Sequence, residues 1–345
     1  MLLGPLTGAA SLERSKPEEQ GVSSEKLQRL SKLSKQYVDE GRVAGIVNLV
    51  LRNGEIIHFE ATGNRGADDP SPMKVDDLFR IYSMTKPITA VAAMQLYEQG
   101  KFQLSDPVTK FVPELEGLKV LNAEGLFEPV AREMTMHQLL MHTTGMSYGF
   151  SAATDAVDQS YAMADLWASK DLDELAARIG TLPLKFHPGD RWHYSVAVDI
   201  TGIVVQRLSG QRFDKYLDEH IFQPLGMADT FFEVPESKRH RFVPNHFLNP
   251  ETGALTNTKS APPPFAYRNG VAFFDYYDVS LFSGGGGLVS TAMDYAKFSE
   301  MMRRGGSFNG ARILGPKTVA FMTKNHLAEG LMLGSWGEKP TDDIG

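Results

Sequence analysis

Alternating apolar and polar residues predict a helix followed by a hairpin near the N-terminus. Residues Ser24–Gly41 are rich in Leu and Lys and read as a helix. Gly45–Arg52 and Glu55–Thr62 read as two strands with Asn53-Gly54 between them. Because Asn-Gly is a strong signal for a two-residue β-turn, we expect these strands to pair as a hairpin.

A buried helix is predicted over Pro87–Gly100, where apolar residues recur with a helical period and Pro87 fits the first turn. Short helices and loops follow as far as Gly226. Further helices are predicted over residues 135–142, 171–179, 199–209, 213–222 and 291–304. Val234–Tyr277 is rich in proline and aromatic residues, which predicts a long irregular segment.

Composition and charge narrow the range of functions. The chain has 345 residues and a formal net charge of −7, which argues against nucleic acid and anionic membrane as partners. It has no cysteine, which excludes a disulfide scaffold, a thiol nucleophile and thiolate metal sites, and fits a cytoplasmic location. Met1–Ala10 is apolar but short and lacks a basic start, so we interpret residues 1–16 as a tail rather than an export signal.

Ser83-Met84-Thr85-Lys86 is the main candidate for catalytic chemistry. It places a serine and a lysine three residues apart at the start of the predicted buried helix, on one face. A serine hydroxyl needs an adjacent base to become a nucleophile, and a lysine is such a base when burial lowers its pKa. Free N–H groups at the helix start would then face the developing oxyanion.

Other motifs give weaker or negative predictions. Gly145–Gly149 matches the G-x-S-x-G elbow of α/β-hydrolases, but a short helix precedes it where that motif needs a strand. Ser147 is therefore predicted to be a turn residue. The glycines at 284–287 lack the ending of a phosphate loop and predict close backbone approach. His137 and His142 have no evident third ligand, so no metal or cofactor is expected.

Taken from the residues alone, Tyr194 is a packing residue that precedes a helix, and Ser195 is a candidate cap for that helix. Tyr194 nevertheless belongs to a set of four sequence blocks whose order and spacing are informative together. The blocks are residues 81–89 (IYSMTKPIT), 139–145 (LLMHTTG), His187-Pro188-Gly189 ahead of Tyr194-Ser195, and 285–291 (GGGLVST).

Together these blocks resemble the family VIII carboxylesterases, the esterase branch of the serine β-lactamase and penicillin-binding-protein superfamily, near the class C β-lactamases. The resemblance implies that Ser83 is the acyl-accepting nucleophile and Lys86 its base. Tyr194 would pass protons between nucleophile, leaving group and water. The same alignment of motifs predicts a substrate-binding set of Val196, Gly286, Gly287, Tyr148 and Phe150.

Two departures from the family pattern matter. Val196 stands where class C β-lactamases have an asparagine that holds the β-lactam side chain, which favours plain esters as substrates. The family's third motif, Trp-x-Gly on a late strand, supplies the second oxyanion N–H. Trp336-Gly337-Glu338 resembles it only faintly, and residues 339–345 are too few for the remaining strands. We therefore expect the chain to end before that motif and the sheet to lack its late strands.

The expected fold is α+β and β-lactamase-like, with an antiparallel sheet flanked by helices and an inserted helical region. It would form one catalytic domain over residues 1–345. Residues 17–80 and 290–345 would be the α/β part and residues 81–289 the helical and loop part, with the site in the groove between the two parts.

The predicted function is hydrolysis of short-chain carboxylic esters through an acyl-enzyme. The expected partner is a small ester rather than nucleic acid or membrane, and the oligomeric state stays open. Four alternatives remain: a β-lactamase, a D-amino-acid peptidase, an acyltransferase, or a non-catalytic peptidoglycan-binding relative.

Overall fold

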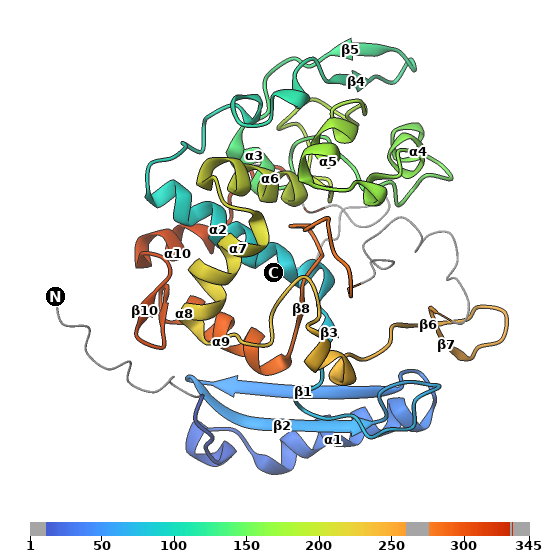
Figure 1. The fold of residues 1–345 in the computed structure, drawn as a ribbon, viewed down its shortest axis with the longest axis vertical. Coiled ribbons are helices and arrows are strands. Elements are labelled where there is room, and N and C mark those ends of the chain that lie inside the picture. The colour runs from blue at the N-terminus through green and yellow to red at the C-terminus, as the bar shows by residue number, and fades with distance from the viewer. Residues whose placement is uncertain (1–11, 260–275, 332, 334–345) are drawn as a thin grey trace. The chain divides into compact units, whose positions relative to one another are not determined.

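The structure is a computed structural model that describes residues 12–259, 276–331 and 333 (Figure 1). The chain divides into two compact units. The first, the hairpin unit, holds described residues 12–80, 219–259 and 289–316, and the second, the helical unit, holds 81–218, 276–288 and 317–331 together with 333. Residues 219–259, which the sequence placed with the helical part, group with the hairpin unit, and residues 317–331 group with the helical one.

The hairpin unit is built on the predicted N-terminal helix and hairpin. Its elements are α1 (Ser24–Asp39), β1 (Gly45–Arg52), β2 (Glu55–Gly63), β3 (Phe79–Arg80), α8 (Gln223–Leu225), β6 (His246–Leu248), β7 (Leu255–Asn257), β8 (Val289–Ser290), α9 (Ala292–Arg303), β9 (Ser307–Phe308) and β10 (Ala311–Arg312). Helix α1 packs along β2, and α9 contacts β1. The β6–β7 hairpin lies within the segment predicted to be irregular, so that prediction was wrong for these six residues.

The sequence signals for the hairpin and its helix are confirmed. Asn53 and Gly54 have φ of 54° and 89°, the left-handed values that a primed two-residue turn requires. Strands β1 and β2 pair antiparallel from Gly45 opposite Gly63 to Arg52 opposite Glu55, with one irregularity after Val50. At the start of α1 the hydroxyl of Ser23 accepts a hydrogen bond from the Lys26 N–H, which satisfies one free donor of the first turn.

Five strand pairs occur among the described residues, and all are antiparallel: β1–β2, β3–β8, β4–β5, β6–β7 and β9–β10. Within this part of the chain each sheet has two strands. The faint third-motif candidate, Trp336-Gly337, lies outside the described residues.

The helical unit is organised around two helices that pack together. Its elements are α2 (Thr85–Glu98), β4 (Lys119–Leu121), β5 (Phe127–Pro129), α3 (Met136–Leu140), α4 (Ala156–Met163), α5 (Leu172–Ile179), α6 (Ala197–Ser209) and α7 (Phe213–Leu217). A π-helical stretch (Asp218–Phe222) follows α7, and all of it except Asp218 groups with the hairpin unit. Helix α10 (Pro316–Met322) follows near the end of the described chain.

Helix α6 is the centre of the helical unit, since it contacts α2, α3, α5 and α7. Residues 197–205 of α6 are all buried, and so are Ile88, Val91 and Leu96 on α2. Burying a large aliphatic side chain contributes about 1.5–3 kcal/mol, so this helix pair fixes the parts of the chain that carry the site. None of the described helices is both long and apolar enough to span a bilayer.

Candidate active site

Ser83 lies in a single 3₁₀ turn, Tyr82–Met84, immediately before α2. Ser83 thus lies at the start of a continuous helical run, as predicted, although the α-helical part α2 begins only at Thr85. The turn is strained, since Tyr82 has φ of 42°, a value that bulky residues rarely adopt. The Met84 N–H donates to the Ile81 carbonyl and the Thr85 N–H to carbonyls of the turn itself, so neither is free to face an oxyanion.

The structure brings Ser83, Lys86 and Tyr194 together. The Tyr194 hydroxyl donates to the Ser83 Oγ at 2.5 Å, and the Lys86 Nζ lies 3.4 Å from the same oxygen. The Lys86 Nζ also lies 4.5 Å from the centre of the Tyr194 ring. Ser83 is exposed, whereas Lys86 and Tyr194 are half-buried. All three belong to the helical unit.

Lys86 is held in an environment that favours its neutral form. Its Nζ donates to the carbonyl oxygen of Gly285 at 2.7 Å and to the Tyr148 hydroxyl at 3.1 Å. Burial lowers the pKa of Lys86 to about 8, against an opposing attraction to the charge of Asp199. The uncharged amine is therefore a minor form at pH 7, but it is far more populated than in an ordinary lysine.

The pKa of Tyr194 is shifted in the opposite direction from that of Lys86. Burial raises the pKa of its hydroxyl above the ordinary value, although the hydrogen bond to Ser83 opposes that change. Its ring packs 4.8 Å from the imidazole of His142, centre to centre. The His142 Nδ1 accepts the Ser195 N–H at 3.2 Å, and burial lowers the pKa of His142 to about 3, with Lys86 and His193 adding to the shift. A neutral His142 thus supports the backbone that follows Tyr194.

Ser195, the predicted N-cap of α6, lies one residue before the observed N-cap position. The residue that precedes α6 is Val196, which makes no side-chain cap, while the Ser195 Oγ accepts the Ala197 N–H at a long 3.4 Å. Val196 is fully buried, and Gly286 and Gly287 are also buried. Their predicted role as substrate-binding residues stays a prediction.

The sequence did not identify Asp199 as a site residue, nor the structural use of Tyr148. Asp199 is fully buried on α6, and its carboxylate accepts the Tyr148 hydroxyl at 2.9 Å. It also accepts the Ser283 hydroxyl at 2.5 Å and the Gly285 N–H at 3.0 Å. One signal could have revealed it, because Asp199 is the single charged residue in the apolar run 197–205.

Ser147 of the G-x-S-x-G match is buried and serves the packing of its turn. Its hydroxyl donates to the Asp158 Oδ1 at 2.5 Å and lies 3.3 Å from the His193 Nε2. Lys185 neutralises Asp158 through an ion pair of 2.9 Å. Ser147, His193 and Asp158 are the residue types of a hydrolase triad, but their hydrogen bonds are arranged differently. In a triad the histidine lies between serine and carboxylate, whereas here the serine donates to the carboxylate directly. This agrees with the sequence-based rejection of Ser147 as nucleophile.

Aromatic rings flank the Ser83 site within the helical unit. The Tyr148 ring lies 5.4 Å from Tyr194, 5.3 Å from Phe150 and 6.1 Å from Trp167, centre to centre. Phe150 is 40% exposed, so of the predicted substrate-binding residues it presents the most open apolar surface. Tyr148 is buried, and its hydroxyl is occupied by Lys86 and Asp199.

Residues 30–343 match the beta-lactamase family. The chain belongs to the beta-lactamase family. It is a serine hydrolase of the β-lactamase fold, and the resemblance and fold predicted from the sequence are confirmed.

Three relatives illustrate where the chain lies among β-lactamase-fold proteins. Protein Rv1367c of Mycobacterium tuberculosis is 34% identical over 299 residues, covering 86% of this chain and 71% of that protein. Esterase EstB of Burkholderia gladioli is 34% identical over 285 residues, 81% of this chain and 71% of the esterase. Among solved structures, EstCE1, described as a hydrolase with promiscuous acyltransferase activity, is 26% identical with a TM-score of 0.71, covering 85% of this chain and 75% of that one.

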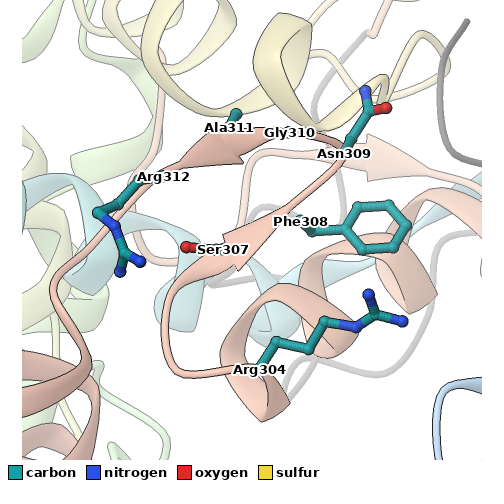
Figure 2. A pocket seen from close by; sticks show the side chains of 7 residues that line it. All are labelled: Arg304, Ser307, Phe308, Asn309, Gly310, Ala311 and Arg312. Carbon is teal, nitrogen blue, oxygen red and sulfur yellow. The ribbon is translucent and has the colours of Figure 1, made fainter. Parts of the chain in front are cut away.

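A separate depression occurs in the hairpin unit of this β-lactamase-family chain, around the turn between β9 and β10. It has a volume of about 470 Å³ and is lined by residues of 304–312 (Figure 2). Arg304 and Phe308 point to the same side of the hairpin, with the guanidinium 5.6 Å from the ring centre, while Arg312 points away (Figure 2). Arg304 is already paired with Glu300, so the depression offers no free cluster of charge.

Proposed function

We propose that this protein hydrolyses short-chain carboxylic esters through an acyl-enzyme on Ser83, with Lys86 as general base and Tyr194 as proton shuttle. The observation that carries the proposal is the contact of one serine oxygen with both partners, at 2.5 Å from the tyrosine hydroxyl and 3.4 Å from the lysine amine. The 34% identity to an esterase, EstB, supports an ester as the substrate.

The pKa shifts favour Lys86 as the base and Tyr194 as the proton donor over the reverse assignment. Lys86 has a pKa lowered to about 8, so its neutral amine is available to take a proton. The pKa of Tyr194 is raised, so its hydroxyl keeps its proton at neutral pH and acts as a donor. A mechanism that began from a tyrosinate would need the opposite shift in the pKa of Tyr194.

In the acylation step, the Lys86 amine takes the Ser83 proton while the serine oxygen bonds to the ester carbonyl carbon. The tetrahedral intermediate then collapses, and the bond from carbon to the alcohol oxygen breaks. Tyr194 protonates the departing alcohol oxygen and recovers a proton from the Lys86 ammonium. The Ser83 N–H is a candidate donor to the oxyanion, and the resemblance assigns a second donor to the third motif.

In the deacylation step, water attacks the acyl carbonyl carbon and gives up a proton to the same Lys86–Tyr194 pair. The bond from the carbonyl carbon to the serine oxygen breaks, and that oxygen is reprotonated. One ester and one water thus give one acid and one alcohol, and the enzyme returns to its starting state. An alcohol in place of water would give acyl transfer, and the described activities of EstCE1 favour this as the second candidate function.

The proposal is tested by measuring the rates at which the parent and Ser83→Ala hydrolyse p-nitrophenyl acetate and butyrate. Ser147→Ala is the matched serine control. We expect Ser83→Ala to lose activity and Ser147→Ala to keep most of it in the folded protein. Activity that survives in Ser83→Ala and disappears in folded Ser147→Ala would overturn the assignment. Adding a primary alcohol and measuring transesterified product against free acid separates the acyltransferase from the hydrolase.

A further inference from the structure

The hydrogen bonds around the Lys86 amine account for every hydrogen that it carries in its neutral form. A neutral amine has two N–H donors and one lone pair, and only the lone pair can take a proton. The Lys86 Nζ has three polar neighbours, which are the Gly285 carbonyl oxygen at 2.7 Å, the Tyr148 hydroxyl at 3.1 Å and the Ser83 Oγ at 3.4 Å. Lys86 acts as a base only when the lone pair faces Ser83.

The direction of the Tyr148 hydroxyl decides which neighbour receives the lone pair. A tyrosine hydroxyl has one proton, and Tyr148 gives it to the buried Asp199 carboxylate at 2.9 Å. Toward Lys86, Tyr148 can therefore only accept. The Gly285 carbonyl is also only an acceptor, so the two amine hydrogens point to Tyr148 and Gly285. The lone pair is left for the Ser83 hydroxyl.

Asp199 is held as an acceptor by the surrounding chain. Besides Tyr148, its oxygens receive the Ser283 hydroxyl and the Gly285 N–H. Gly285 makes this close approach possible, because a Cβ at that position would lie 2.2 Å from the Asp199 Oδ2 and 2.5 Å from the Tyr148 hydroxyl. The chain of donors thus runs in one direction, from Tyr194 to Ser83, Lys86, Tyr148 and Asp199.

We propose that Asp199 and Tyr148 are positioning residues that direct the lone pair of Lys86 at the Ser83 hydroxyl. This inference rests on the proposed function, in which Lys86 is the base. Asp199 also acts through its charge, which favours the ammonium form of Lys86 and opposes the effect of burial. The other titratable groups that face Lys86 are Tyr148, Tyr194 and His142, and at neutral pH all three are uncharged.

Asp199→Asn and Tyr148→Phe test the inference, with Tyr161→Phe on α4 as a control for the loss of a buried tyrosine hydroxyl. The readout is kcat/KM for p-nitrophenyl acetate against pH. Removing the Asp199 charge should lower the pKa of Lys86, so the rising limb in Asp199→Asn should move to lower pH. The plateau should also fall about ten- to a hundredfold, because the asparagine amide can turn Tyr148 into a donor toward Lys86.

Tyr148→Phe should lower the plateau by about tenfold or more, while Tyr161→Phe should stay within about threefold of the parent. An unmoved limb in Asp199→Asn overturns the inference whatever its plateau, since a merely structural role would lower the plateau alone. A parent-like plateau in Tyr148→Phe also overturns it, and this variant decides the matter if Asp199→Asn does not fold.

Ser83→Ala distinguishes failure of the inference from failure of the proposed function. If Ser83→Ala is inactive and both positioning variants behave like the parent, the inference alone is wrong. If Ser83→Ala retains ester turnover, the proposed function is wrong, and the positioning of Lys86 falls with it.

Discussion

The pH dependence of ester hydrolysis should report the ionisation of Lys86. The lysine must be neutral to accept the Ser83 proton, and burial lowers its pKa to about 8. The neutral fraction is then about 1% at pH 6, about 9% at pH 7 and about 90% at pH 9. Because this pKa lies below the ordinary lysine value and the active form is deprotonated, kcat/KM should rise with pH, by about 90-fold between pH 6 and pH 9.

Steady-state hydrolysis of p-nitrophenyl acetate, corrected for the buffer rate at each pH, measures this limb. The histidines near the site cannot mimic it, because burial lowers the pKa of His142 to about 3 and that of His193 to about 4. Lys86→Ala is the control, and we expect a rate lower by about a hundredfold or more that no longer rises through pH 8. A parent profile that is flat or falling between pH 6 and 9 would refute the assignment of Lys86 as base.

Three further outcomes follow from the same contacts. Ser147→Ala should destabilise the protein by about 1–3 kcal/mol, because Asp158 loses a buried donor, and thermal unfolding beside an activity assay should show a lower Tm with most turnover retained. Gly285→Ala should lower kcat by about tenfold or more, since the added methyl displaces Asp199 and Tyr148; parent-like kcat would contradict the close packing. Short acyl esters should be preferred over long ones. Nitrocefin should be turned over weakly, because Val196 lacks the side-chain amide that holds a β-lactam side chain; rates on cephalosporins that match those on esters would contradict this preference for esters.

The sequence predicted helices and strands well where apolar residues recur with a clear helical or strand periodicity. Helix α1, the β1–β2 hairpin and α2 follow from apolar spacing and from the Asn53-Gly54 turn. Strands β3 and β8 have two residues each, too few to show any alternation, so the sequence could not reveal their pairing. Each of these two strands forms through its partner more than 200 residues away in the chain.

The site shows the same division between local and distant information. Ser83 and Lys86 are three residues apart, so their proximity follows from helical geometry. Tyr194 reaches Ser83 across 111 residues, and only the family resemblance pointed to it. The bond between Tyr148 and Asp199 spans 51 residues and depends on how the loop after α3 meets α6, which residue spacing does not determine.

Locating the covalent adduct tests the acyl-enzyme most directly. The protein would be reacted with a fluorophosphonate probe, and in parallel acid-quenched during turnover of a p-nitrophenyl ester, and both samples digested and mapped by peptide mass spectrometry. We predict one adduct on the peptide that carries Ser83, lost in Ser83→Ala and retained in Ser147→Ala. An adduct on Ser147, or ester turnover at parent rates with Ser83 unmodified by either reagent, would contradict the account.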